Sequence, residues 1–552
     1  MNPFVTIYKT AHERLLAEGA HADQPNVSLS LHFAQHTDQR RYNIPTTLTE
    51  VAAIIPYSPN ADTQDIMLCL QNPPGGGNRV QCIHDCNPAF DALHYVLLFP
   101  LGDLGWRDLM PKHPNGHGGK LPQAQYYTYR LHEHTNEPPT LLYGGKLFQQ
   151  FVVDAWARIE QSKLSWLRFN QGTLCAAQLN GIMDAAHAGD HLSNVGQPII
   201  LPSGHIGSPQ SMFQFCQDSY AVAAAFGPKP DLFITVTANP QWEDIQVALL
   251  PGQVSSDRPD IVTRVFHLKI ESLLDEITNK GIFGTTVAHI YTIEFQKHGL
   301  PHMHLLIFLN AAAKPITPAQ VDSIVCAELP DQAAEPHLYS IVSKVMIHRP
   351  CGALGNSNAV CLDDKGKCTK GFPKSFSEET VMTADGYPTY HHCNTGTHEV
   401  GGQAHSIDNH WVVLYNPYLS GCYECHINAE VCVSVCATKY IHKYIFKGHD
   451  QITAVVEQDE IKQYLDARWL GDSEAMYCLF AYHTHKEWPP VERLPIHLAD
   501  GQIAVYDPAR HDAAQVIQRV AAKDTKLLAF FKLNETDPRA RTMLYSEIPY
   551  HY

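Results

Sequence analysis

Two strongly apolar segments lie close together near the middle of the chain and limit how it can fold. AHIYTIEFQ (288–296) and HMHLLIFL (302–309) each have the length and the β-branched and aromatic content of a strand. The short connection KHGLP between them predicts an antiparallel hairpin. We also expect a strand in DLFITVTANP (231–240), an amphipathic helix at 259–279 and helical structure over 147–187.

The second strand of this hairpin begins with a His-x-His pattern. With 33 histidines in 552 residues, chance alone gives about two such patterns. The chain has three, but His132/His134 and His483/His485 lie in segments without a long apolar strand. His302 and His304 do open such a strand, where residues two apart share one face.

A carboxylate on the preceding strand extends this pattern. Glu294 lies eight residues before His302 across the predicted turn, so it is expected to approach the histidine pair. Two imidazoles and one carboxylate with open water positions suit Mg²⁺ or Mn²⁺, with Zn²⁺ as an alternative. A pair of hydrogen-bonded structural histidines explains the pattern from the residues alone equally well.

Two tyrosines lie four residues apart in SVCATKYIHKYIFKG (434–448), which is predicted to be a helix ending at a glycine. Tyr440 and Tyr444 would share one helix face, and each is followed at the third position by a lysine, Lys443 or Lys447. A nearby positive charge favours the phenolate, the more nucleophilic form of tyrosine. An amphipathic helix with buried tyrosines and solvated lysines is the competing interpretation.

A third cluster lies in the Gly-, Cys- and Lys-rich segment 345–375. His348, Cys351, Cys361 and Cys368 are residue types that bind a structural Zn²⁺, although their spacing is looser than in common zinc fingers. The 15 cysteines of the chain are expected to be free thiols or metal ligands, because no secretory signal sequence is recognisable.

The overall composition limits the class of protein. Hydrophobic residues make up 44% and charged residues 17%, as in ordinary globular chains, and no apolar run predicts a membrane span or a membrane partner. The net charge of -16 is unusual for a nucleic-acid-binding protein, which needs at least a local basic surface.

Several segments together resemble the replication-initiator part of Helitron transposases, the Helitron helicase-like N-terminal family. The resemblance runs from about residue 40 to the C-terminus and rests on these stretches: NPAFDALHYVLLFPLGDLGW, KLFQQFVVDAWARIEQSKLSWLRFNQ, LPSGHIGSPQSMFQFCQDSYAVAAAFGPKPDLFITVTANPQW, EFQKHGLPHMHLLIFL, HRPCG, YNPYLSGCYECHINAEVC and KYIHKYIFKGHD.

The resemblance implies an α+β fold with an antiparallel HUH nuclease core flanked by helices, and additional N-terminal and C-terminal α/β segments. We expect an N-terminal region (1–110), a mostly helical segment (111–230), the nuclease core (231–450) with its Cys-rich insertion, and a C-terminal α+β segment (451–552). His302, Met303 and His304 resemble the metal motif of this family, and Glu294 matches a third ligand.

The resemblance also implies a reaction. Tyr440 resembles the attacking residue and Tyr444 the second tyrosine of a two-tyrosine enzyme that cleaves single-stranded DNA at transposon ends through a 5′-phosphotyrosine. The lysines that would meet phosphate are Lys439, Lys443, Lys447, Lys365, Lys367, Lys370 and Lys374.

The sequence also sets limits on this function. There is no G-x-x-x-x-G-K-[ST] motif, and the chain stops at EIPYHY before a helicase would begin, so we expect no ATPase or unwinding activity and a helicase acting in trans. The alternatives are a helicase-less relic that only binds DNA and a metal hydrolase without covalent chemistry. A nuclear or cytoplasmic location is expected, the nuclear one from the substrate only.

Overall fold

The structure is a computed structural model in which part of the chain is described. The described residues are 52–54, 66–69, 80–83, 87–107, 109–113, 118–135, 137–169, 175–188, 197–198, 201, 204–295, 299–382, 388–397, 407–433, 469–498, 501–506 and 511–552.

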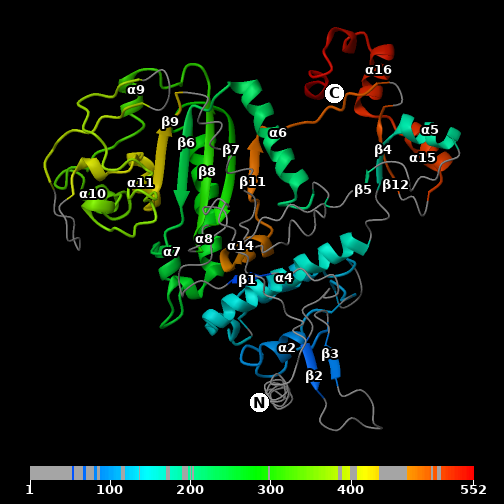
Figure 1. The fold of residues 1–552 in the computed structure, drawn as a ribbon, viewed down its shortest axis with the longest axis horizontal. Coiled ribbons are helices and arrows are strands. Elements are labelled where there is room, and N and C mark those ends of the chain that lie inside the picture. Colours follow the sequence, from blue (N-terminus) through cyan, green and yellow to red (C-terminus); the bar gives the residue numbers. More distant parts are fainter. Residues whose placement is uncertain are drawn as a thin grey trace.

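A five-stranded antiparallel sheet forms the centre of the fold, with the strand order β11-β7-β8-β6-β9 (Figure 1). The predicted hairpin is present, because neighbouring residues of its two strands pair antiparallel from Thr286 opposite Leu309 to Phe295 opposite Pro301. The predicted α+β class, with an antiparallel sheet flanked by helices, is confirmed. The strands are β6 (Leu232–Thr237), β7 (Thr286–Phe295), β8 (Pro301–Leu309), β9 (Ile427–Val431) and β11 (His485–Trp488).

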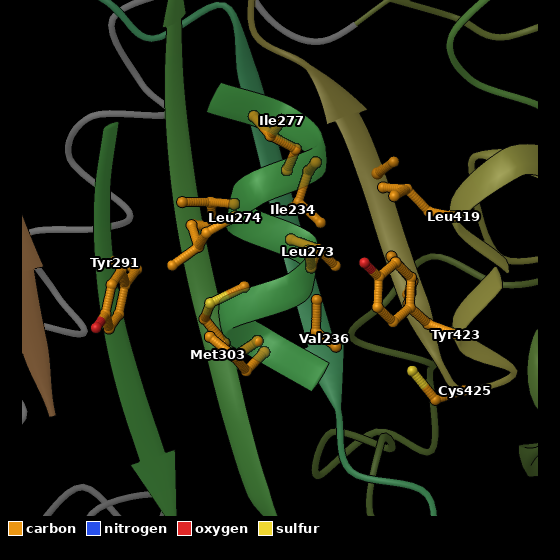
Figure 2. Close-up of a cluster of buried hydrophobic side chains, with 14 of the residues drawn as sticks. Ile234, Val236, Leu273, Leu274, Ile277, Tyr291, Met303, Leu419, Tyr423 and Cys425 are labelled. Carbon is orange, nitrogen blue, oxygen red and sulfur yellow. The ribbon is translucent and has the colours of Figure 1, made fainter. Parts of the chain in front are cut away.

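One face of this sheet is apolar along its length and is covered by helix α8 (Pro259–Thr278), close to the predicted helix at 259–279. Proline at the first helical position suits the helix start, because its missing N–H would have no partner there. In Figure 2, Leu273, Leu274 and Ile277 of α8 lie over Ile234 and Met303 of the sheet. These side chains are almost fully buried, so the α8 contact is a major source of hydrophobic stabilisation.

The opposite face is divided into an apolar and a polar part. Helix α6 (Pro209–Phe226), whose N-terminus is capped by the Ser208 side chain, lies beside β7 and β11 (Figure 1). It packs over an apolar group that includes Phe233, Leu306 and Phe308. Residues 302, 304, 306 and 308 alternate onto this face, so the same strand leads from the α6 core to the two histidines.

A second core surrounds helix α4 (Lys146–Phe169), which packs against α14 (Asp472–Leu479) and α3 (Gln123–Arg130). The helical prediction over 147–187 is confirmed at α4 and at a separate helix, α5 (Leu179–Ala188), but it is wrong at the short strand β4 (Cys175–Gln178). Backbone pairing of β4 with β12 (Ile503–Tyr506) overrides the local helical pattern.

Distant parts of the chain also meet around α4. Strand β1 (Ala52–Ile54) pairs with β10 (Trp469–Gly471), which leads directly into α14. None of the described helices is long and apolar enough to cross a membrane. The other elements are β2 (Ile66–Cys69), β3 (Val80–Ile83), α2 (Phe90–His94), β5 (Gln197–Pro198), α7 (Glu243–Gln246), α9 (Pro318–Asp322), α10 (Pro336–Val345), α11 (Pro417–Tyr423), α15 (Ala513–Ala521) and α16 (Lys526–Thr536).

Candidate active site and metal centre

The two histidines of β8 lie between polar residues of both neighbouring strands. Glu294 of β7 is directly opposite His302, and Thr237 of β6 is opposite His302 on the other side. Thr235 is the corresponding partner of His304. Because residues directly opposite each other in antiparallel strands share a face, all five side chains gather on the polar part of one sheet face.

Hydrogen bonds fix the orientation of both imidazoles. The hydroxyl of Thr237 lies 2.8 Å from Nδ1 of His302, and the hydroxyl of Thr235 lies 3.2 Å from Nδ1 of His304. The Nε2 atom of His304 contacts a carboxylate oxygen of Glu294 at 2.9 Å. Both histidines are 6% exposed, so their rings are held within the protein rather than on a mobile surface.

This arrangement fits a divalent metal ion with hard ligands. A histidine that binds a metal through one ring nitrogen usually engages its other nitrogen in a supporting hydrogen bond, which is the role open to the two threonines. Adjacent ligands on an octahedral ion at about 2.1 Å lie about 3 Å apart, close to the contact between His304 and Glu294. The potential ligand atoms of Glu294, His302 and His304 do not, however, all lie within 4.8 Å of one another.

The polar face continues onto the edge strand β11. His485 is opposite Thr292 of β7 and its Nδ1 lies 3.0 Å from the Thr292 hydroxyl. Its Nε2 lies 3.4 Å from Glu487, and hydrogen bonding to His485 lowers the pKa of the Glu487 carboxyl. From the sequence, His485 was not expected at this site, and Thr235 and Thr237 were expected only as strand residues. The β-branched Thr-x-Thr alternation in FITVT was the available signal for the two threonines.

On the other side of the histidines, strand β9 brings the partly buried carboxyl group of Glu430 toward lysines of the Cys-rich segment. Glu430 shares the sheet face with Phe233, and it accepts a 2.8 Å hydrogen bond from Asn428. Burial raises the pKa of Glu430, while Asn428 and then Lys374 and Lys370 act to lower it. Lys370 and Lys374, two of the four lysines of this segment that are predicted to bind phosphate, therefore lie close enough to Glu430 to influence its ionisation.

The four predicted zinc ligands converge. Nε2 of His348 lies 3.6 Å from the sulfurs of Cys351 and Cys361 and 3.5 Å from that of Cys368. In a tetrahedral site with Zn–S near 2.3 Å and Zn–N near 2.0 Å, a nitrogen and a sulfur ligand lie about 3.5 Å apart. The spacing in the folded protein is therefore that of a Cys₃His zinc centre.

Local structure explains this convergence. The backbone N–H of His348 donates to Trp411, and its ring stacks on Phe372 with 4.3 Å between the centroids. Leu362 and Cys368 form an isolated antiparallel bridge, which brings Cys368 close to the other three residues of the cluster. Burial, Lys370 and Lys374 lower the pKa of His348, which favours the neutral imidazole that a metal ion requires.

The thiols of this cluster differ in their acidity. Burial and hydrogen bonding to the neighbouring thiols raise the pKa of Cys351 to about 12. Burial also acts against ionisation of Cys368, but backbone hydrogen bonds from the segment ending at Phe372 contribute to a lowered pKa. The lowered pKa makes Cys368 easier to ionise to the thiolate, the form in which cysteine binds metal.

The predicted nucleophile residues Tyr440, Tyr444, Lys443 and Lys447 lie outside the described residues. Their position relative to Glu294 and the two histidines therefore stays a prediction.

Comparison with known protein families finds a similarity in part of the chain. The family model for the Helitron helicase-like domain at the N-terminus matches residues 126–307. This region begins within α3 and ends within β8, so it includes Glu294, His302 and His304 but not the Cys₃His cluster. A search of curated proteins gave no match. The matched region is therefore similar to a Helitron-type domain.

Proposed function

We propose that the polar sheet face belongs to a metal-dependent HUH-type endonuclease of a Helitron-like element, which nicks and joins single-stranded DNA. The observation that carries this proposal is the arrangement of Glu294, His302 and His304, with both Nδ1 atoms oriented by threonines. Its position within the region similar to the Helitron domain adds independent support.

The site residues would act by holding a metal ion and by orienting its ligands. Glu294, His302 and His304 would hold Mg²⁺ or Mn²⁺, and a bound ion would supply positive charge to the scissile phosphate. With the ion bound, Thr235 and Thr237 would accept hydrogen bonds from the Nδ1–H groups of the histidines, which would leave each Nε2 lone pair for the metal ion. The low exposure of the histidines limits competition from water, so their charge interactions are stronger than at the surface.

The proposed nucleophile is Tyr440 or Tyr444. A bond forms between the phenolic oxygen and phosphorus, and the bond from phosphorus to the 3′-oxygen of the preceding nucleotide breaks. The phenol loses its proton and the departing 3′-oxygen gains one, which leaves a 5′-phosphotyrosine and a free 3′-hydroxyl. Attack by another 3′-hydroxyl on this linkage reverses the step and joins strands. Lys443 and Lys447 would favour the phenolate and bind phosphate.

We further propose that His348, Cys351, Cys361 and Cys368 hold a structural Zn²⁺. The converging distances support this assignment, and the closed set of four protein ligands is typical of structural rather than catalytic zinc. Through Lys370 and Lys374, the zinc-bound segment would present positive charge beside strand β9.

Cleavage of a pool of single-stranded oligonucleotides of random sequence tests the catalytic assignment. We expect cleavage with Mn²⁺ or Mg²⁺, its loss on chelation, and a loss of at least about 100-fold in His304→Ala because one metal ligand is missing. The control is His134→Ala, which alters another His-x-His pattern in an exposed turn. Salt-sensitive DNA binding without cleavage in the wild-type protein would favour the DNA-binding relic instead.

A further inference from the structure

A third group of side chains of metal-binding types does not belong to either site described above. Glu328, His391 and Cys393 each place one potential ligand atom within 4.8 Å of the others. Ligand atoms of a tetrahedral zinc site lie about 3.3 to 3.8 Å apart, so these three groups need only a small approach to bind one ion. The Cys393 sulfur lies 3.0 Å from Nε2 of His391, and the carboxylate of Glu328 lies 3.7 Å from the other ring nitrogen.

A buried asparagine holds two of these residues in position. Asn409 is 1% exposed, and its side-chain amide donates to the backbone carbonyl of Cys393 at 2.9 Å and to Glu328 at 3.4 Å. The backbone N–H of Cys393 donates to the same carboxylate oxygen of Glu328 at 2.6 Å. One carboxylate oxygen of Glu328 thus accepts hydrogen bonds from Cys393 and Asn409, and the other lies near the ring of His391. Supporting hydrogen bonds of this kind orient metal ligands.

The ligand types point to a transition-metal ion. A thiol, an imidazole and a carboxylate are each Zn²⁺ ligands, whereas a thiol is not a ligand that Mg²⁺ or Ca²⁺ prefers. The carboxylate of Glu378 lies 3.8 Å from the Cys393 sulfur and is available as a fourth ligand. The order Cys393, His391, Glu328 also resembles a nucleophile triad, but 3.7 Å is too long for the hydrogen bond that orients a catalytic imidazole.

We propose that Glu328, His391 and Cys393, with Glu378 as a fourth ligand, form a second structural site for Zn²⁺ or a similar transition-metal ion. The ion would link the segment 388–397 to the segment that contains Glu328. The adjacent Tyr390 accepts a 2.8 Å hydrogen bond from the backbone N–H of Val431, at the end of β9. The metal would therefore also stabilise the edge of the central sheet.

Metal content of the full chain tests this proposal independently of any nuclease activity. The protein is loaded with Zn²⁺ under reducing conditions, dialysed, and measured by inductively coupled plasma mass spectrometry. Relative to wild type, Cys393→Ala and Cys351→Ala should each lose one equivalent of zinc, and the double variant should lose two. The exposed Cys422 provides the control, since Cys422→Ala should lose none.

A second variant separates metal loss from misfolding. His391→Gln removes the imidazole but keeps the backbone hydrogen bond between Cys393 and Glu328, and it should lose the same single equivalent while its circular dichroism spectrum remains that of wild type. Zinc content equal to wild type in either Cys393→Ala or His391→Gln would overturn the proposal. A full loss of zinc in Cys393→Ala with an unchanged fold would do so too, because the Cys₃His cluster does not include that residue.

Discussion

Replacing Thr237 by valine would remove the hydrogen-bond partner of His302 with little change in side-chain shape. In the metal-bound form, Nε2 of His302 would donate its lone pair to the ion, so Nδ1 must carry the proton and donate it to Thr237. Without metal, the neutral ring can place its proton on either nitrogen. The substitution therefore penalises the metal-bound form more than the metal-free form.

The size of this effect follows from the contact. Loss of a residue that supports a metal ligand typically weakens metal binding about 10- to 100-fold. This corresponds to about 1.4 to 2.8 kcal/mol, within the cost of about 1 to 3 kcal/mol for an unsatisfied buried donor. We expect Thr237→Val to reach the upper part of this range and Thr235→Val the lower part, because their contacts with the histidines are 2.8 and 3.2 Å.

Isothermal titration calorimetry with Mn²⁺ measures this directly. The matched control is Thr292→Val, which makes the same change on the same sheet face but removes a partner of His485 rather than of a proposed ligand. Its Mn²⁺ affinity should stay within about threefold of wild type, as expected for a residue that supports no ligand. Equal affinity in Thr237→Val and wild type, or a larger loss in Thr292→Val, would refute the role assigned to the threonine contacts.

Three further changes test other parts of the structure. Arg158→Met leaves the buried Asp91 carboxylate without its ion-pair partner and should lower the free energy of unfolding in urea by about 3–5 kcal/mol; a loss below about 1 kcal/mol contradicts this. Burial lowers the pKa of His289 to about 4, so the unfolded chain binds more protons between pH 4 and 6.5 and stability falls as pH decreases through this window. His289→Phe, which keeps a ring beside Trp488, should reduce that slope in denaturation curves; an unchanged slope argues against it. Cys351→Ser should lower the melting temperature of zinc-loaded protein but not of chelator-treated protein, and equal losses in both would exclude a zinc effect.

Much of the central sheet could be predicted because its signals are local. Strand alternation and the short connection predict that Glu294 approaches the histidine pair without any knowledge of the remaining fold, and the strand register places it opposite His302. Close sequence spacing likewise predicted the Cys₃His group, whose four members fall within one short segment.

The missed features depend on contacts between distant segments. Thr235 and Thr237 become partners of the histidines only because β6 pairs with β8, and His485 joins the same face only because β11 pairs with β7. Glu328 is far in sequence from His391 and Cys393, so no spacing pattern connects them. The helical prediction over 147–187 failed at residues 175–178 for the same reason, since strand pairing with β12 decides the structure there.

The most direct test of the proposed nuclease is the fate of the two ends of a labelled single-stranded oligonucleotide pool incubated with protein and Mn²⁺. Attack by Tyr440 or Tyr444 through a 5′-phosphotyrosine predicts that a 3′-end label becomes covalently attached to the protein. A 5′-end label should appear in a shorter free fragment, and the Tyr440→Phe/Tyr444→Phe double variant should give neither product. Release of both labelled ends as free fragments, or cleavage that survives in the double variant, would contradict the covalent mechanism.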